Sequence, residues 1–120
     1  MLFRSGDKLD IYSGEDALTV PMISMGAAGT ISVLSNVVPA ESVAMTDAAL
    51  AGDFATAAAL QCKLLALTNA LFSEVNPIPA KAAVSAMGYG QENLRMPLSK
   101  MESPAREVLF EEMRKLGVQV

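Results

Sequence analysis

Two adjacent carboxylates, Glu15 and Asp16, are the candidates for acid–base chemistry in this chain of 120 residues. They follow a short alternating run, Leu9–Tyr12, and the turn residues Ser13 and Gly14. Neighbouring carboxylates can titrate at different pH values when their surroundings differ, which allows one to act as an acid and the other as a base. The alternative is that both lie at the N-terminus of a helix, where their charge complements the helix dipole. We favour this second interpretation.

The other reactive side chains are the lysines and a single cysteine. A lysine that forms a Schiff base needs a neutral amine, but Lys81 falls on a predicted helix, and we expect it to be solvated or structural. Cys62 falls on an apolar helical stretch and is predicted to fill space in the core. Histidine is absent, which excludes His-based triads and nearly all catalytic zinc sites. We expect neither a metal nor a cofactor.

The composition is apolar for so small a chain. Hydrophobic residues make up 52% and charged residues 18%, against about 45–50% and about 25% in average domains. This excess suggests that part of the surface is covered by something outside the chain. A net charge of −4 argues against nucleic-acid binding, because nothing would neutralise the phosphates. The single cysteine favours a reducing compartment, and we expect the cytoplasm.

The elements that would position these residues follow the order strand, helix, strand. The first strand is predicted over Leu9–Tyr12, a short helix after Glu15, and a second strand over Thr30–Leu34. Short connections make this a βαβ unit with parallel strands. Because two parallel strands are not stable alone, the pattern predicts the end of a larger α/β barrel or doubly wound sheet.

Helical patterns fill the rest of the chain. First-turn prolines and closing glycines predict helices over 39–51, 54–73, 79–87 and 103–116. Asn76-Pro77-Ile78-Pro79 is predicted to fix the turn into the third of these. The uncharged stretch 17–40 is long enough to span a bilayer, but its proline, glycines and polar residues favour a buried segment with a loop. We therefore expect no membrane span.

Four stretches resemble the family of dihydrodipicolinate synthase and N-acetylneuraminate lyase. They are YSGEDAL at 12–18, GAAGTISVLSNVVP at 26–39, FSEVNPIPAK at 72–81 and LRMPL at 94–98. The resemblance covers the chain from about Leu9 to Val120 and is closer to the dihydrodipicolinate synthases. It implies an α/β fold, namely a C-terminal fragment of a TIM (β/α)8 barrel. Residues 1–52 would hold the last two parallel strands, and residues 53–120 the helical C-terminal extension.

The resemblance also implies a chemistry. Family members form a Schiff base between a lysine and pyruvate, and dihydrodipicolinate synthases condense it with aspartate semialdehyde in lysine biosynthesis. The lysine and the proton-relay tyrosines would precede this chain, so we expect the chain alone to be inactive. Ile31 matches the position whose backbone lies against pyruvate, and Gly14, Glu15 and Asp16 match the turn that borders the substrate. The usual turn is Gly-Asp-Asp, so Glu15 is one methylene longer.

Two other interpretations stay open. The chain could be a truncated paralogue that acts as an interaction module, because apolar excess and exposed strand edges favour association. We expect a homo-oligomer, or association with a longer homologue. A small membrane protein is the third alternative.

Overall fold

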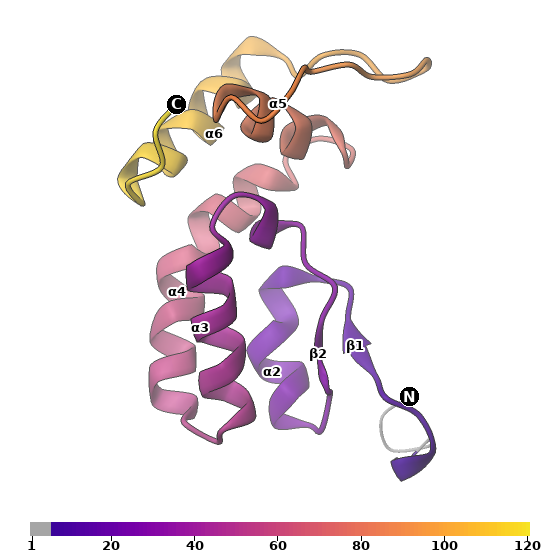
Figure 1. Ribbon diagram of the computed structural model, residues 1–120, viewed down its shortest axis with the longest axis vertical. Coiled ribbons are helices and arrows are strands. Elements are labelled where there is room, and N and C mark those ends of the chain that lie inside the picture. The colour runs from indigo at the N-terminus through magenta and orange to yellow at the C-terminus, as the bar shows by residue number, and fades with distance from the viewer. Residues whose placement is uncertain (1–5) are drawn as a thin grey trace.

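A pair of short parallel strands lies at one edge of a helical body in the computed structural model, which describes residues 6–120 (Figure 1). β1 (Tyr12–Ser13) pairs with β2 (Gly29–Thr30), with Tyr12 opposite Gly29 and Ser13 opposite Thr30. The chain passes from β1 to β2 through a 3-10 turn, η2 (Asp16–Leu18), and a helix, α2 (Thr19–Ser24). The predicted βαβ unit with parallel strands is therefore confirmed.

The predicted strand boundaries, however, are wrong. Leu9–Tyr12 was expected to be a strand, but the ladder begins only at Ile11, whose oxygen accepts a hydrogen bond from Ala28 N at 2.8 Å. Thr30–Leu34 was expected to be the second strand, but β2 ends at Thr30. The reason is that the main-chain N–H groups of residues 33 and 34 donate to the carboxylate of Asp16 instead of to a strand.

Four helices follow the strands, as predicted, and their ends agree with the prediction to within two residues. They are α3 (Pro39–Leu50), α4 (Phe54–Leu71), α5 (Ile78–Ala86) and α6 (Ser103–Lys115), and two further 3-10 turns are η1 (Gly6–Lys8) and η3 (Leu34–Asn36). Gly52 closes α3 at a φ of 82°, which a glycine adopts without strain. The side chain of Asp53 then caps α4, since its Oδ1 accepts a hydrogen bond from Thr56 N at 3.1 Å. Glu102 precedes α6 as its cap residue, and Pro104 lies in its first turn.

The core runs through α4, which contacts α3 along its length and α6 at its far end (Figure 1). Leu64, Leu67 and Leu71 of α4 are fully buried, together with Met45 of α3 and Leu109 of α6. These residues belong to one hydrophobic cluster that also includes residues of α2, η3 and α5. The elements at the carboxyl ends of β1 and β2 are therefore held by packing against helices that follow them in the chain.

The prediction that Cys62 is buried is wrong, because the cysteine is exposed on α4. The buried positions of this helix are spaced by three or four residues, and Gln61 occupies the one next to Cys62. A polar side chain takes this place because its amide makes two buried hydrogen bonds.

The stretch 17–40 does not form a continuous helix. It is divided among η2, α2, β2, η3 and the first two residues of α3. A different helix, Phe54–Leu71, is long and apolar enough to cross a membrane by length and composition, and 39% of its residues are buried inside the structure. The core helix of a globular protein passes the same test, and α4 contributes its buried face to the core cluster.

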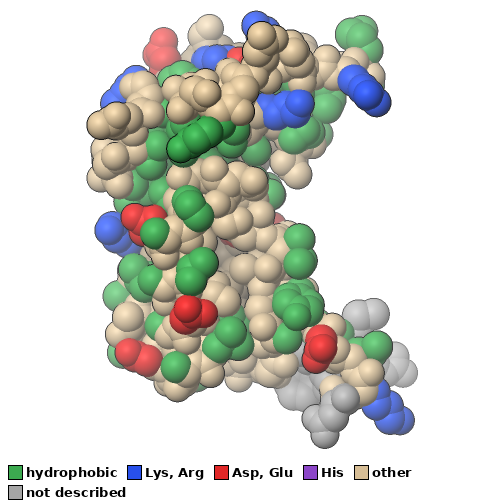
Figure 2. Space-filling view, viewed as in Figure 1, with side chains coloured by type: hydrophobic (Ala, Val, Ile, Leu, Met, Phe, Trp, Pro, Cys, Tyr) green, Lys and Arg blue, Asp and Glu red, His purple; other side chains and the backbone are tan. Residues whose placement is uncertain are grey.

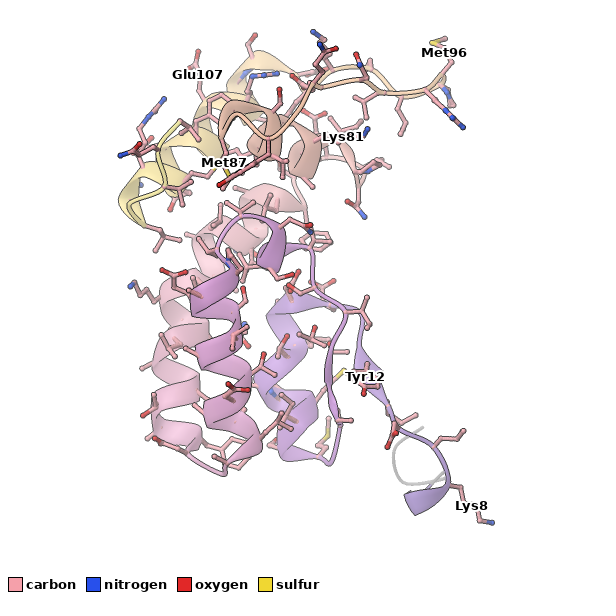
Figure 3. The ribbon with its side chains drawn as sticks, in the orientation of Figure 1. Lys8, Tyr12, Lys81, Met87, Met96 and Glu107 are labelled. Carbon is pink, nitrogen blue, oxygen red and sulfur yellow. The ribbon has the colours of Figure 1, made fainter. Side chains whose placement is uncertain are left out.

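An extended segment between α5 and α6 projects from the body (Figure 1). Its tip carries Met96, which is 90% exposed (Figure 3). Its base is anchored by an ion pair, in which the Arg106 guanidinium lies 2.7 Å from the buried carboxylate of Glu92. The same guanidinium stacks over the ring of Phe110. We call residues 88–102 the arm.

Candidate functional site

The carboxyl ends of the two strands form the candidate site. Because β1 and β2 are parallel, the turn Gly14–Asp16 and the segment Ile31–Val33 follow them at the same edge of the sheet. Asp16 joins the two. Its Oδ2 accepts hydrogen bonds from Val33 N at 2.9 Å and from Leu34 N at 3.0 Å. The side chain is buried, with Asp16 only 1% exposed.

Ser13 fixes the turn on the β1 side. Its hydroxyl donates to the main-chain oxygen of Glu15 at 2.8 Å and accepts from Glu15 N at 3.2 Å. Its main-chain oxygen accepts from Ile31 N at 2.8 Å and from the Thr30 hydroxyl at 3.2 Å. The first residue of the second segment is therefore tied to the last residue of β1.

A buried glutamine of α4, Gln61, forms hydrogen bonds with the main chain that follows β1. The Nε2 of Gln61 donates to the main-chain oxygen of Asp16 at 3.0 Å, and its Oε1 accepts from Val20 N at 3.2 Å. All three residues are buried. Ser13 and Gln61 were not among the residues expected to matter. The signal for Gln61 was available, since it is a lone polar residue at a buried-face spacing on an apolar helix.

The residues predicted to border a substrate divide into two groups. Gly14 and Glu15 are exposed, and Ile31 is 70% exposed, so these three lie on the surface of the described chain. Asp16 is buried and its carboxylate binds main-chain N–H groups. The structure does not bring Glu15 and Asp16 together as an acid–base pair in one environment. Both residues do lie at the start of a helical segment, as the second interpretation predicts, because Glu15 is the cap residue of η2 and Asp16 is its first residue. The Asp16 carboxylate, however, accepts from the N–H groups at the start of η3.

One peptide group at this edge is unpaired among the described residues. The amide of Ile31 and those of residues 33 to 38 donate hydrogen bonds within the chain, as do several side chains nearby. In residues 6–120, no such bond is made by Ser32 N or by the main-chain oxygen of Ile31. An exposed, unpaired N–H and C=O can bind polar groups of a ligand. The peptide between Ile31 and Ser32 therefore has both its N–H and its C=O free of partners within the described residues.

A hollow opens beside this edge. A cavity of about 400 Å³ is lined by Val33 and Asn36 near η3, by Asn76 and Lys81 near the start of α5, and by the beginning of the arm. Figure 2 shows the concave outline between the body that carries the strands and the lobe that carries α5 and α6. Asn36 orders its loop, since its Nδ2 donates to the main-chain oxygen of Val33 at 3.0 Å. The hollow was not predicted from the sequence.

Lys81 lies on the wall of this hollow (Figure 3). It is on α5, as predicted, and it is exposed. Its ammonium donates to the main-chain oxygen of Asn93 at 2.7 Å, so it holds the arm against the helix. No carboxylate side chain of the described residues lines this cavity or the adjoining one of about 560 Å³ that Lys81 and Arg95 share.

The remaining lysines lie away from the strand ends. They are Lys8 in η1, Lys63 in α4, Lys100 in the arm and Lys115 in α6, and all are exposed. In Lys115, hydrogen bonds from the ammonium to Glu112 and Glu111 raise the pKa above its usual value of 10.5. No group of three or more potential metal-ligating side chains occurs in the part of the chain that the structure describes.

A family model, sequence relatives and solved structures all match this chain to one family. The model of the Dihydrodipicolinate synthetase family matches residues 2–115. The 4-hydroxy-tetrahydrodipicolinate synthase of Sorangium cellulosum is 49% identical over 113 residues, which is 94% of this chain and 38% of the relative. The crystal structure of dihydrodipicolinate synthase from Aquifex aeolicus superimposes with a TM-score of 0.96 and 38% identity, over 99% of this chain and 41% of that one.

A second solved structure carries a ligand. The chloride-inhibited dihydrodipicolinate synthase from Acinetobacter baumannii, complexed with pyruvate, superimposes with a TM-score of 0.93 and 33% identity, over 98% of this chain and 40% of that chain. The present chain thus spans about two fifths of the length of the relatives that it matches. It has part of their fold, and the parallel pair β1–β2 agrees with this.

Proposed function

The chain belongs to the Dihydrodipicolinate synthetase family, and we propose that it forms one wall of the pyruvate site in a lyase of lysine biosynthesis. In this proposal β1 and β2 are the last two strands of a TIM barrel, within residues 1–52. Residues 53–120 are the helical C-terminal extension. The chain acts in the cytoplasm, as an oligomer.

The observation that supports the proposal is the arrangement of the strand ends. Active sites of TIM barrels lie at the carboxyl ends of the strands, and Gly14 and Ile31 occupy these ends here. The unpaired peptide between Ile31 and Ser32 faces no hydrogen-bond partner within the described residues. Its N–H and C=O supply one donor and one acceptor, which suits a small ligand that bears a carboxylate and a carbonyl.

The covalent step needs an amine at the site, and no lysine of the described residues 6–120 lies at the strand ends. By family resemblance, a lysine amine on the preceding strand condenses with the carbonyl of pyruvate and releases water. Loss of a methyl proton gives an enamine, whose carbon attacks the aldehyde of aspartate semialdehyde. We propose that this chain binds and orients the pyruvate unit, and that the lysine comes from polypeptide that supplies the other strands.

Reconstitution tests the proposal. The chain is co-expressed with the strands of the Sorangium cellulosum relative that it does not match, and condensation of pyruvate with aspartate semialdehyde is assayed. We expect a stoichiometric complex that turns over, while neither part alone does. As a control, Ile31→Pro removes the N–H that donates to Ser13 O and should abolish turnover without preventing complex formation. Two separately purifying, inactive parts would contradict the proposal.

A second candidate function is association without catalysis. Leu9, Tyr12 and Ile31 are 65%, 50% and 70% exposed, and hydrophobic side chains gather on the edge that carries β1 and β2 (Figure 2). A two-stranded sheet with apolar side chains at its edges favours pairing with further strands. We propose that, if the complex forms but remains inactive, the chain is a module that docks on a longer homologue or on a second copy of itself.

A further inference from the structure

The hydrogen bonds of Asp16 differ from those of a catalytic carboxylate. An acid or base must contact the group with which it exchanges a proton. Asp16 is 1% exposed, and its Oδ2 is already occupied by the N–H groups of Val33 and Leu34. Its Oδ1 has no hydrogen-bond partner among the described residues but is buried as well, so neither oxygen is open to a ligand at the surface of the site.

The same hydrogen bonds act on the main chain of the proposed pyruvate wall. Ser13 O holds the N–H of Ile31 on one side, and the Asp16 carboxylate holds the N–H of Val33 on the other. The Ile31–Ser32 peptide lies between these two fixed points. One peptide group flanks it on each side, and each is joined to it by bonds that rotate freely about φ and ψ. Its unpaired N–H and C=O can therefore keep a constant direction only while both neighbouring peptide groups are held.

We infer that Asp16 is a positioning residue, whose carboxylate sets the orientation of the Ile31–Ser32 peptide toward the ligand. This inference rests on the proposed function, since it assigns a role within the same wall. It replaces the acid–base interpretation made from the sequence, and it adds a second role to the position of Asp16 at the start of η2. The Gln61 amide, which donates to the main-chain oxygen of Asp16 at 3.0 Å, keeps the carboxylate in register with β2.

The first test measures amide hydrogen exchange in the full chain by NMR, for wild type, Asp16→Ala and Asp16→Asn. Alanine removes the acceptor, and we expect exchange at Val33 and Leu34 to accelerate by about tenfold or more. Asparagine keeps a carbonyl oxygen in the same place and should restore most of the protection. The Ala28 amide, which donates to Ile11 O, should be unchanged and serves as the internal control. Asp47→Ala, at an exposed carboxylate of α3, is the matched variant.

The outcomes are decisive in either direction. Unchanged exchange at Val33 and Leu34 in Asp16→Ala would overturn the inference. If the alanine variant loses protection throughout, including at Leu64 in the core, the asparagine variant decides. Native protection at Val33 and Leu34 in Asp16→Asn, with the core protected again, supports the inference. Continued loss of protection throughout would mean that Asp16 stabilises the whole fold and not this segment, and would overturn it.

A second test uses the reconstituted complex described above. Asp16→Ala should raise KM for pyruvate by about tenfold or more, and Asp16→Asn should recover most of this loss. If Asp16 were an acid or base, asparagine would lower kcat as much as alanine does, and that result would overturn the inference. Absence of turnover in the wild-type complex counts against the proposed function alone, because the exchange experiment on the chain is independent of it.

Discussion

Gln61 on α4 and Asp16 at the end of β1 are 45 residues apart in the chain and are joined by a hydrogen bond of 3.0 Å from Nε2 to the main-chain oxygen. The other end of the same amide accepts from Val20 N at 3.2 Å. The Gln61 side chain thus links α4 to the first residue of η2 and to the first turn of α2. The strand ends are positioned by a helix that follows them.

Replacing Gln61 with leucine should therefore destabilise the chain. The substitution removes the acceptor of the buried Val20 N–H and one of the two hydrogen bonds to the Asp16 main-chain oxygen, which still accepts from Thr19 N. Loss of the Val20 partner costs about 1–3 kcal/mol. The free energy of unfolding is measured by urea denaturation. Gln91→Leu is the control, because Gln91 is exposed and should change the stability by about 0.5 kcal/mol or less. A Gln61→Leu variant as stable as wild type would show that the link is dispensable.

Two adjacent leucines of α4 offer a matched pair for the core. Leu64 is fully buried, whereas Leu65 is 40% exposed. Leu64→Ala should cost about 2–5 kcal/mol in the free energy of unfolding, because it leaves a cavity between α4 and its neighbours. Leu65→Ala should cost about 1 kcal/mol or less. Equal losses in urea denaturation would mean that α4 does not pack through the Leu64 face.

The helices could be predicted closely because their ends are marked locally. Pro39 opens α3, Gly52 closes it and Asp53 caps α4, and each signal acts within a few residues. The strands could not be bounded in this way. The length of a strand depends on which main-chain N–H groups bond to a neighbouring strand. The N–H of Val33 bonds instead to the carboxylate of Asp16, which lies 17 residues earlier in the sequence.

In the candidate site, too, some features could be predicted from the sequence and others depend on tertiary contacts. The turn Gly14–Asp16 and the residue Ile31 were identified through family resemblance, but their division into exposed and buried groups was not, because burial depends on helices later in the chain. The error at Cys62 has the same origin. An apolar helix offers several faces, and the one that turns inward is set by tertiary contacts. These are the packing of the buried leucines of α4 and the hydrogen bonds of Gln61 with Asp16 and Val20.

The cap of α4 predicts a dependence of stability on pH. The side-chain and main-chain hydrogen bonds from Thr56 hold the pKa of Asp53 below its ordinary value of 3.8. A carboxyl group whose pKa is lowered by folding stabilises the fold above its unfolded pKa, and this stabilisation disappears as the pH falls through the folded pKa. Asp53→Ala should therefore lower Tm at pH 7.

The difference in Tm between wild type and Asp53→Ala should shrink as the pH falls below 3.8. Asp53→Asn is the control, because its amide oxygen caps the helix regardless of pH. Thermal unfolding followed by circular dichroism from pH 7 to about pH 3 measures the three variants. A difference between wild type and alanine that does not change with pH would contradict the assignment of the cap to the ionised carboxylate.

The exposed apolar edge predicts self-association. Tyr12 and Ile31 lie on adjoining strand ends and are at least half exposed, so burying them against a second copy gains roughly 25 cal/mol per Å² of apolar area. We expect sedimentation to report a dimer or higher oligomer, and Ile31→Glu to shift it toward monomer. Leu50→Glu, at an exposed leucine of α3, should leave the assembly unchanged. A monodisperse wild-type monomer with a sharp melting transition would contradict the expectation.

The last prediction concerns the lysines and the Schiff base. A lysine condenses with pyruvate at a useful rate only when its amine is neutral near pH 7, which requires burial or a neighbouring cation. Lys81 is exposed and its ammonium donates to Asn93 O at 2.7 Å, while hydrogen bonds to Glu112 and Glu111 raise the pKa of Lys115. Treatment of the chain with pyruvate and borohydride should therefore leave no stoichiometric adduct by intact-mass spectrometry. In the reconstituted complex, the adduct should form on the other polypeptide. A single pyruvyl addition mapped to Lys81 would instead place the reactive amine in the hollow beside Asn36 and Asn76, and would overturn the assignment of this chain to the non-covalent wall.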